Sequence, residues 1–206
     1  MDHDGHAPER KSSRARIVEA AAALMYERGV RGATVDEVLA AAGAGKGQFY
    51  YYFESKEALV REVLDHQLAA ILGTFEAADP DSWEGMRAWL DGLVESHRRR
   101  GLGGCPLETL ASEASAESEA LAEVVDQAFT RWLERLAVAL RHLRDDGVLE
   151  PGADPDALAE ATLASIQGAY LLSAAKRDPD VMRHGIERAW AYLQSWSTGT
   201  ESGSRR

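Results

Sequence analysis

The sequence predicts an all-α fold of about nine helices, and two observations carry this prediction. Apolar residues recur at the spacing of one helix face nearly throughout the chain, whereas no stretch alternates apolar and polar residues at the strand period. The same segments tend to begin at Ser, Thr or Asp and to end near Gly or Pro, as helices do. We therefore expect three N-terminal helices followed by a larger helical part.

Length and composition fit one or two compact domains, because the chain has 206 residues, of which 45% are hydrophobic and 28% are charged. No apolar run approaches the ~18 residues that a membrane-spanning helix needs. The first residues lack the apolar core of a secretory signal. The single cysteine, Cys105, excludes an intrachain disulfide and suits a reducing compartment. We expect a cytoplasmic protein with no membrane partner.

Charge is distributed unevenly along the chain. The net charge of −11 argues against a nucleic-acid partner, but residues 1–60 carry 8 Lys/Arg and 9 Asp/Glu, whereas residues 61–206 carry 15 and 25. The segment ERKSSRAR, residues 9–16, places 4 cations within 8 residues. The N-terminal part can therefore present a basic face although the whole chain is acidic.

Local signals place the first helix. Ser12 or Ser13 can cap a helix that runs to about Arg28, where Gly29 stops it.

Two short helices follow. Thr34-Val-Asp-Glu37 is a capping box, in which the threonine hydroxyl accepts a backbone N–H and the glutamate reaches back. The helix that it opens ends at Gly43, and a third short helix covers 46–52.

The later helices are longer. Ser55 caps a fourth helix that Asp79-Pro80 breaks, and the Gly-rich segment 97–106 is expected to be irregular. Further helices are expected at about 82–94, 107–115, 118–146, 156–176 and 179–197.

The segment around residues 34–56 has the pattern of a helix-turn-helix, with two short helices joined by a tight Gly turn and a third helix before them. In that arrangement the helix from Lys46 would lie in the DNA major groove. Gly45 and Gly47 remove side chains where the backbone must approach phosphates, and Lys46 adds a cation at the helix N-terminus. Gln48 is the side chain best placed to hydrogen-bond a base edge.

Tyr50, Tyr51 and Tyr52 suit the same surface, because the rings can pack on sugar and thymine methyl groups while the hydroxyls donate to phosphates. Three adjacent positions span about 200° of a helix, so at least one ring must face outward. Thr34 and Lys56, at the starts of the flanking helices, would face the phosphate backbone. The alternative is a Gly-punctuated corner whose tyrosines belong to the core.

The segment ATVDEVLAAAGAGKGQFYYYFESKEALV, residues 33–60, resembles the N-terminal domain of the TetR family of transcriptional regulators. The resemblance extends over about residues 14–68 and includes the capped short helix, the Gly turn, the Lys-Gly pair and the aromatic run. It implies that Phe49 and Phe53 pack inward. The residues that it places on DNA are Lys46, Gly47, Gln48, Tyr50, Tyr51 and Tyr52.

Two positions depart from the family pattern. Gly45 stands where many relatives have a serine, so a phosphate-binding hydroxyl is missing, and many relatives have a histidine at the place of Tyr51 or Tyr52. Neither departure removes the site, but both leave the operator sequence open.

The resemblance implies a domain organisation. It places a helix-turn-helix DNA-binding domain at 14–56 and a larger ligand-binding and dimerisation domain at 57–197. A flexible arm at 1–13 and a disordered polar tail at 198–206 flank them.

TetR-like regulators are homodimers in which each subunit delivers one recognition helix to half of a palindrome. The family's interface is a four-helix bundle from the last two helices of each chain, and the small, broadly apolar residues of 157–176 permit this. The alternative is that both helices are core of a single chain. The expected interface residues are Ala161, Leu163, Ala164, Ile186, Trp190 and Leu193.

The family also implies a cavity in the middle helices for a small-molecule effector that moves the DNA-binding domains apart. Aromatic residues at helical spacing are also ordinary core, and a lone Cys on an apolar helix is more often packing than a sensor. The candidate lining residues are Trp83, Trp89, Cys105, Phe129, Trp132 and Tyr170.

No HExxH, CxxC, Walker loop or nucleophile elbow occurs, so we expect no enzyme activity, no metal site and no cofactor. Together with these observations, the resemblance implies a cytoplasmic homodimeric repressor that binds a palindromic double-stranded DNA operator and is released by a small-molecule effector. The alternatives left open are an activator, or a regulator controlled by a protein partner or by oxidation of Cys105.

Overall fold

The computed structural model describes residues 12–100 and 104–199. These residues form nine α-helices and no strand, which confirms the all-α prediction. The bounds are α1 Ser13–Gly32, α2 Val35–Ala42, α3 Lys46–Tyr52, α4 Lys56–Glu76, α5 Trp83–Arg100, α6 Pro106–Glu117, α7 Glu119–Asp145, α8 Pro155–Lys176 and α9 Pro179–Gln194.

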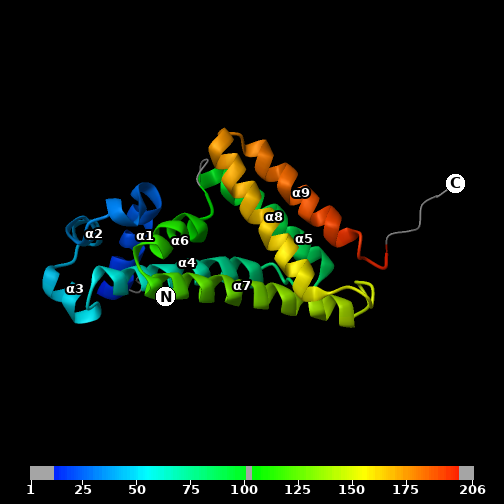
Figure 1. Cartoon of the computed structure of the whole chain (residues 1–206), viewed down its shortest axis with the longest axis horizontal. Helices are drawn as coiled ribbons and strands as arrows, with labels where there is room; N and C mark the ends of the chain where they lie inside the picture. Colours follow the sequence, from blue (N-terminus) through cyan, green and yellow to red (C-terminus); the bar gives the residue numbers. More distant parts are fainter. Residues whose placement is uncertain (1–11, 101–103, 200–206) are drawn as a thin grey trace, which may run out of the picture.

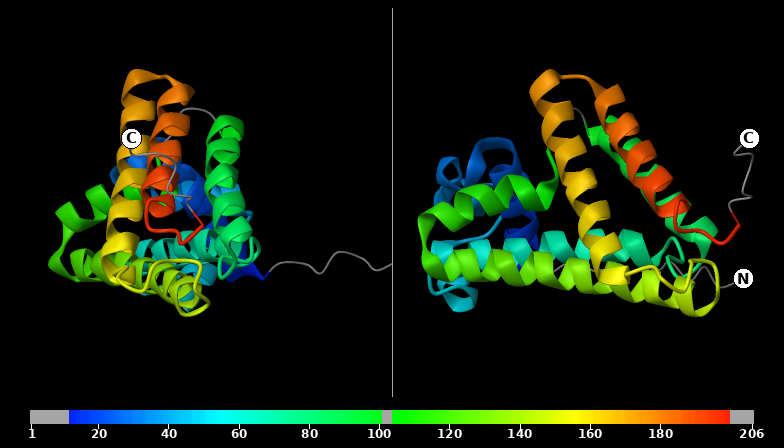
Figure 2. Two further views of the ribbon diagram at one scale, coloured as in Figure 1. Left: turned by 90° about the vertical axis from the view of Figure 1, so that its right-hand side faces the viewer. Right: turned by 45° about the vertical axis from the view of Figure 1, so that its right-hand side comes forward.

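The helices form two groups joined by two long helices, α4 and α7, which lie side by side and run in the same direction (Figure 1). α1, α2 and α3 gather at one end, and α4 and α7 run side by side from that end toward the other. α8 and α9 pack as an antiparallel pair at the far end, with α5 against α9 (Figure 2). α6 lies between the two groups and contacts α1, α4 and α7. α6 therefore connects the N-terminal helices with the long pair α4 and α7.

Side-chain caps open several helices where the sequence predicts. Ser12, Ser55 and Ser118 each accept a backbone N–H three residues ahead, at 3.2, 3.1 and 3.1 Å. Asp154 and Asp178 cap α8 and α9, each of which begins with a proline. These capping signals are local, which is why the sequence predicts the helix starts well.

Gly29 interrupts α1, but helical geometry resumes as far as Gly32. Its φ of 78° and ψ of 167° lie in a region that is essentially restricted to glycine. A Cβ at this position would also lie 2.2 Å from the Glu113 carboxylate of α6. The break in α1 is therefore fitted to a residue of the larger helical group.

α5 is longer than predicted, because residues 97–100 are helical rather than part of an irregular connection. The His97 side chain is buried, and its Nε2 lies 2.8 Å from Ser173 Oγ in α8. Arginine is also a good helix former. Packing and propensity together extend the helix to Arg100.

Two further helices have bounds that differ from the predicted ones. α6 covers Pro106–Glu117 and so exceeds the expected segment at both ends. α9 ends at Gln194, because the chain then turns and the Trp196 carbonyl accepts the Glu150 N–H at 2.8 Å. This contact ties the end of α9 to the turn before α8.

The predicted arm at 1–13 lies outside the described residues except for Ser12 and Ser13, of which Ser13 begins α1. Of the predicted tail, only residues 198 and 199 are described, and Thr198 Oγ1 donates to the Gly147 carbonyl at 2.8 Å. In the described part of the chain, every helix is too short or too polar to span a lipid bilayer.

Candidate nucleic-acid interface and internal cavity

α3 sorts its aromatic residues onto two faces. Phe49 and Phe53 are 1% and 2% exposed, whereas Tyr50, Tyr51 and Tyr52 are 68%, 81% and 38% exposed. The rings of Phe49 and Phe53 lie 5.5 Å apart and fix α3 to the core. The three tyrosines thus form an exposed aromatic surface, which excludes the alternative that they belong to the core.

The glycines beside α3 are not required by packing within the chain. A Cβ built at Gly45 or at Gly47 meets no heavy atom within 4 Å, and neither residue has a positive φ. The space above this part of α3 is therefore open to another molecule.

Lys46 is exposed, and its Nζ lies 3.1 Å from an Asp36 carboxylate oxygen. Both side chains are exposed, so this ion pair contributes little to stability. The ammonium can leave Asp36 for a phosphate at small cost.

Gln48 is bonded within the chain at both ends of its amide. Its Oε1 accepts the Gly45 N–H at 3.1 Å, and its Nε2 donates to Ser13 Oγ at 3.0 Å. In this conformation the amide caps α3 and holds the start of α1. To contact a base, as the sequence predicts, it would have to give up these bonds.

Thr34 and Lys56 also make structural contacts. Thr34 Oγ1 donates to Glu37 Oε2 at 2.7 Å and accepts the Glu37 N–H at 3.3 Å, so the predicted capping box is present. These hydrogen bonds from Thr34 lower the pKa of Glu37. Lys56 Nζ donates to the Val30 carbonyl at 2.6 Å. Lys56 therefore closes the end of α1, rather than presenting a free ammonium to phosphate.

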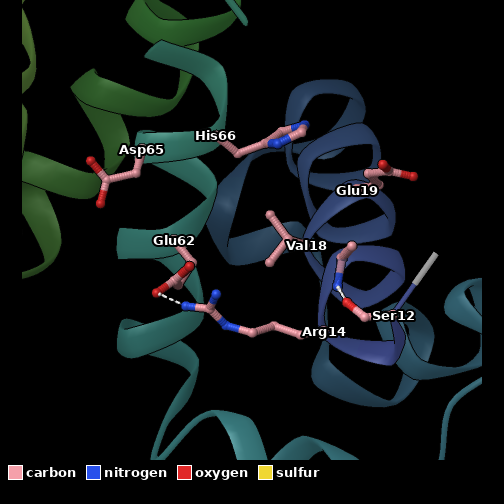
Figure 3. Close-up of a pocket in the computed structure, with 8 residues that line it drawn as sticks. Ser12, Arg14, Val18, Glu19, Glu62, Asp65 and His66 are labelled. Atoms are coloured by element: carbon pink, nitrogen blue, oxygen red, sulfur yellow. Dashed lines mark hydrogen bonds and ion pairs between the residues drawn. The ribbon is translucent and has the colours of Figure 1, made fainter. Parts of the chain in front are cut away.

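A groove between α1 and α4 adjoins this domain (Figure 3). Arg14 reaches across it to Glu62, with 2.5 Å between Nη2 and Oε1. Glu19, Asp65 and His66 line the rest. Its acidic lining is unsuited to a phosphate backbone, so α3 is the better surface for DNA.

A cavity of about 320 Å³ lies in the larger helical group, between residues of α4 to α8. Of the predicted residues, Trp89, Cys105, Trp132 and Tyr170 line it. The sequence missed several polar lining residues, namely Gln67, Thr74, Ser96, Arg99 and Arg100. The run of charges at 97–100 could touch an anionic ligand, but such runs are usually solvated, so the sequence alone did not select the two arginines as lining residues.

Trp83 and Phe129 do not line this cavity. Trp83 packs on Trp190, with ring centroids 4.4 Å apart, and Phe129 lies half-buried beside Trp132 on the same helix. Aromatic spacing alone could not separate residues that line the cavity from residues that pack beside it.

Three ionisable groups at or beside the cavity, Tyr170, Cys105 and His97, have pKa values shifted in favour of their neutral forms. Burial raises the pKa of Tyr170 to about 12 and also raises the pKa of the Cys105 thiol. Burial, together with the charge of Arg100, lowers the pKa of His97. Ser173 donates its hydroxyl hydrogen to the Asp178 carbonyl at 2.7 Å, so its oxygen accepts from His97 Nε2.

α6 links the cavity to the DNA-binding helices. Its N-terminal cap is Cys105, and in its last turns Glu113 Oε2 accepts the Val30 N–H at 2.8 Å. Tyr26 of α1 donates to the Gly104 carbonyl at 3.1 Å. One helix therefore touches both the cavity and the broken end of α1.

The predicted dimer residues fall into two sets. Leu163, Ile186 and Leu193 are buried inside the protomer, so they are not available to a second chain in this conformation. Ala164 is exposed and Ala161 is half-buried, while half-buried Trp190 packs on Trp83. These predicted residues divide in this way because each of the two helices presents one apolar face to the core and another to the outside.

The outward apolar face was only partly predicted. Leu171, Leu172 and Tyr192 are 57%, 53% and 44% exposed. Together with Ala161 and Ala164 they form what we term the outer face of α8 and α9.

An N-terminal helix-turn-helix joined to a larger helical domain defines a class, the helix-turn-helix transcriptional regulators. Residues 17–63 match the family model for bacterial regulatory proteins of the tetR family, and residues 82–187 match the model for the C-terminal domain of LmrA/YxaF-like transcriptional regulators. The chain belongs to the TetR family of transcriptional regulators. It is thus a DNA-binding regulator and not an enzyme.

Individual relatives agree with this assignment. An HTH-type transcriptional regulator of Mycobacterium tuberculosis is 32% identical over 179 residues, which cover 80% of this chain and 86% of the relative. The HTH-type transcriptional repressor DhaR of Mycobacterium sp. strain GP1 is 28% identical, over 80% of this chain and 84% of its own.

A crystal structure of a regulatory protein TetR from Rhodobacter sphaeroides shares the fold. Its TM-score is 0.77 at 24% identity, and the match covers 88% of this chain and 98% of that one.

Proposed function

We propose that the protein is a cytoplasmic, homodimeric repressor that binds a palindromic operator through α3 and is released by a small-molecule effector. The observation that carries the proposal is the exposed surface of Tyr50, Tyr51 and Tyr52 beside Lys46 and the unfilled space at Gly47. Exposed rings and a weakly held ammonium are suited to a nucleic-acid backbone. The repressor DhaR among the relatives supports the direction of regulation.

The proposed division of labour assigns DNA binding to residues 14–56 and effector binding with dimerisation to residues 57–197. α6 supports this division, because it contacts the cavity through Cys105 and α1 through Glu113. An effector acts by its different affinity for the operator-binding state and the released state. We infer that the cavity changes shape between these states and that α6 transmits the change.

For the homodimer, the outer face of α8 and α9 is the proposed contact surface. Leu171 and Leu172 are adjacent and more than half exposed, and this contact of apolar side chains with water is unfavourable in a lone chain. Introducing Leu171→Glu with Leu172→Glu should give a monomer in light scattering, whereas Gln127→Glu with Thr130→Glu on α7 should leave the dimer intact. A dimer that survives the first pair places the interface elsewhere.

Control by oxidation of Cys105 is a weaker alternative. The thiol is buried, and its raised pKa keeps it protonated, whereas oxidants react with accessible thiolates. No comparable observation favours an activator or a protein partner.

The test of DNA binding is fluorescence anisotropy with the DNA upstream of the protein's own gene. Lys46→Ala should weaken binding and lower the slope of log affinity against log salt by about 1. The matched control is Arg98→Ala, which removes an exposed cation from α5 and should change neither quantity. Equal slopes for wild type and Lys46→Ala contradict the assignment.

A further inference from the structure

Among the described residues, the polar lining of the cavity carries two cations and several neutral side chains, and no carboxylate. Arg99 and Arg100 are its charged residues, and no Asp or Glu is among the described residues that line it. Two carboxylates lie close by without lining the cavity: Glu95 is 4.0 Å from Arg99, and Glu108 lies in the first turn of α6. The lining therefore opposes a cation and favours an anion.

Two buried indoles have unused donors. The Nε1 atoms of Trp89 and Trp132 are buried without any hydrogen-bond partner, and both residues line the cavity. Buried N–H groups in folded proteins are nearly always bonded, so two unpaired donors at one cavity point to a ligand that carries acceptor oxygens. An indole has no acceptor atom, so these two groups cannot be satisfied by a ligand's donors.

Arg100 brings positive charge to the same place. It lies close enough to Tyr170 and His97 to influence the pKa of each, and both of these groups are themselves neutral at pH 7. The charge of the guanidinium is thus not cancelled by an anion in the lining. Apolar groups, including Ile71, Leu93 and Pro106, supply the rest of the wall.

We propose that the effector is a flat aromatic or unsaturated monocarboxylate, whose oxygens are bound by Arg100 and the two indole N–H groups. The apolar body lies against the aliphatic and aromatic wall. A dianionic phosphate is a poorer match, because most of the lining is apolar and the two cations are at the rim. This inference rests on the proposed effector response and names the chemical class of that effector.

The test uses three molecules of one shape that differ in the head group: 2-naphthoate, 2-naphthamide and 2-naphthamidine. Isothermal titration of the full-length protein should show 2-naphthoate binding about tenfold or more tightly than the neutral amide, with the cationic amidine weakest. Tighter binding of the amide or the amidine, or binding of none of the three, overturns the proposal.

Matched variants locate the head group. Trp132→Phe keeps an aromatic ring but removes the N–H, and Arg100→Gln removes an exposed cation without touching the core. Arg100→Gln should lower 2-naphthoate affinity about tenfold while leaving 2-naphthamide affinity within about twofold, whereas Trp132→Phe should weaken both ligands, because the amide oxygen also accepts an N–H. The controls are Trp83→Phe and Arg98→Gln, whose residues lie outside the cavity and should bind as wild type. An unchanged 2-naphthoate affinity in Arg100→Gln overturns the proposal even if Trp132→Phe is unstable.

Failure of the ligand class and failure of the effector response give different results. If 2-naphthoate binds with the expected variant pattern but leaves the DNA complex intact, the ligand class stands and the release mechanism is wrong. If a cationic or neutral ligand releases the DNA, the release mechanism stands and the carboxylate assignment is wrong.

Discussion

The two functional regions of the molecule are built in opposite ways. The proposed DNA-facing surface comes from seven consecutive residues of α3, held by two buried phenylalanines while the tyrosines stay exposed. The cavity is assembled from five helices, and its aromatic residues are at the same time core. Substitutions of the exposed tyrosines of α3 should therefore leave the protein folded, whereas substitutions of most cavity residues should destabilise it.

The largest expected effect tests this separation of function and stability. Trp132→Ala should lower the free energy of unfolding by about 3–5 kcal/mol, because it empties a fully buried site. Tyr51→Ala, in contrast, should change it by about 0.5 kcal/mol or less, since the ring is exposed. Urea denaturation followed by circular dichroism measures both, and similar losses in the two variants break the comparison.

The contact that joins the regions gives the next effect. Glu113→Ala leaves the Val30 N–H without its acceptor and should cost about 1–3 kcal/mol in unfolding free energy. Glu117→Ala removes only the Arg31 ion pair, 3.4 Å long, and should cost about 0–1 kcal/mol. If α6 transmits the effector signal, Glu113→Ala should also weaken the effect of ligand on DNA affinity. An unchanged ligand effect in this variant, measured by anisotropy, removes α6 from the mechanism.

A smaller effect has opposite signs for stability and for function. Gly47→Ala should raise the unfolding free energy by about 0.5–1 kcal/mol, because glycine is a poor helix residue and the added methyl group has free space. The same methyl group should weaken DNA binding if the backbone approaches phosphates there. Gly73→Ala in α4, where space is also free, should stabilise without changing DNA affinity. Stronger DNA binding by Gly47→Ala contradicts the close approach.

The smallest effect is on pH dependence. Because burial lowers the pKa of His97 below its unfolded value of about 6.5, the folded state binds fewer protons than the unfolded state. The stability that neutral His97 provides is present above this unfolded value and falls as the pH drops below it. His97→Gln should flatten the melting temperature profile between about pH 7 and pH 5. A profile as steep as that of wild type excludes His97 as a source of the slope.

The features that could be predicted from the sequence are those set by neighbouring residues, such as helix caps and helix ends. The capping box at Thr34 and the bounds of α3 depend on neighbouring residues, and the structure contains both; the break at Gly29 is also present, although α1 resumes after it. The opposite orientations of Phe49 and the tyrosines follow from the family resemblance and the helix period.

Contacts between distant segments explain what the sequence could not reveal. Lys56 bonds to Val30, 26 residues away, and Gln48 bonds to Ser13, 35 residues away, so no local pattern reveals that these side chains are engaged. The extension of α5 depends on the packing of His97 against α8, and it carries Arg99 and Arg100 to the cavity, which a run of charges in the sequence cannot show. Leu163 and Ala164 are adjacent, yet one is buried and the other exposed, which composition cannot distinguish.

The central claim is that the tyrosine surface of α3 binds the operator, and one titration tests it most directly. Wild type and a triple variant, Tyr50→Ser, Tyr51→Ser and Tyr52→Ser, are titrated against the upstream DNA at several salt concentrations, after both are shown to melt alike. The account predicts steeply salt-dependent binding by wild type and a loss of about 100-fold or more in the triple variant. Equal affinities for two equally folded proteins would contradict it.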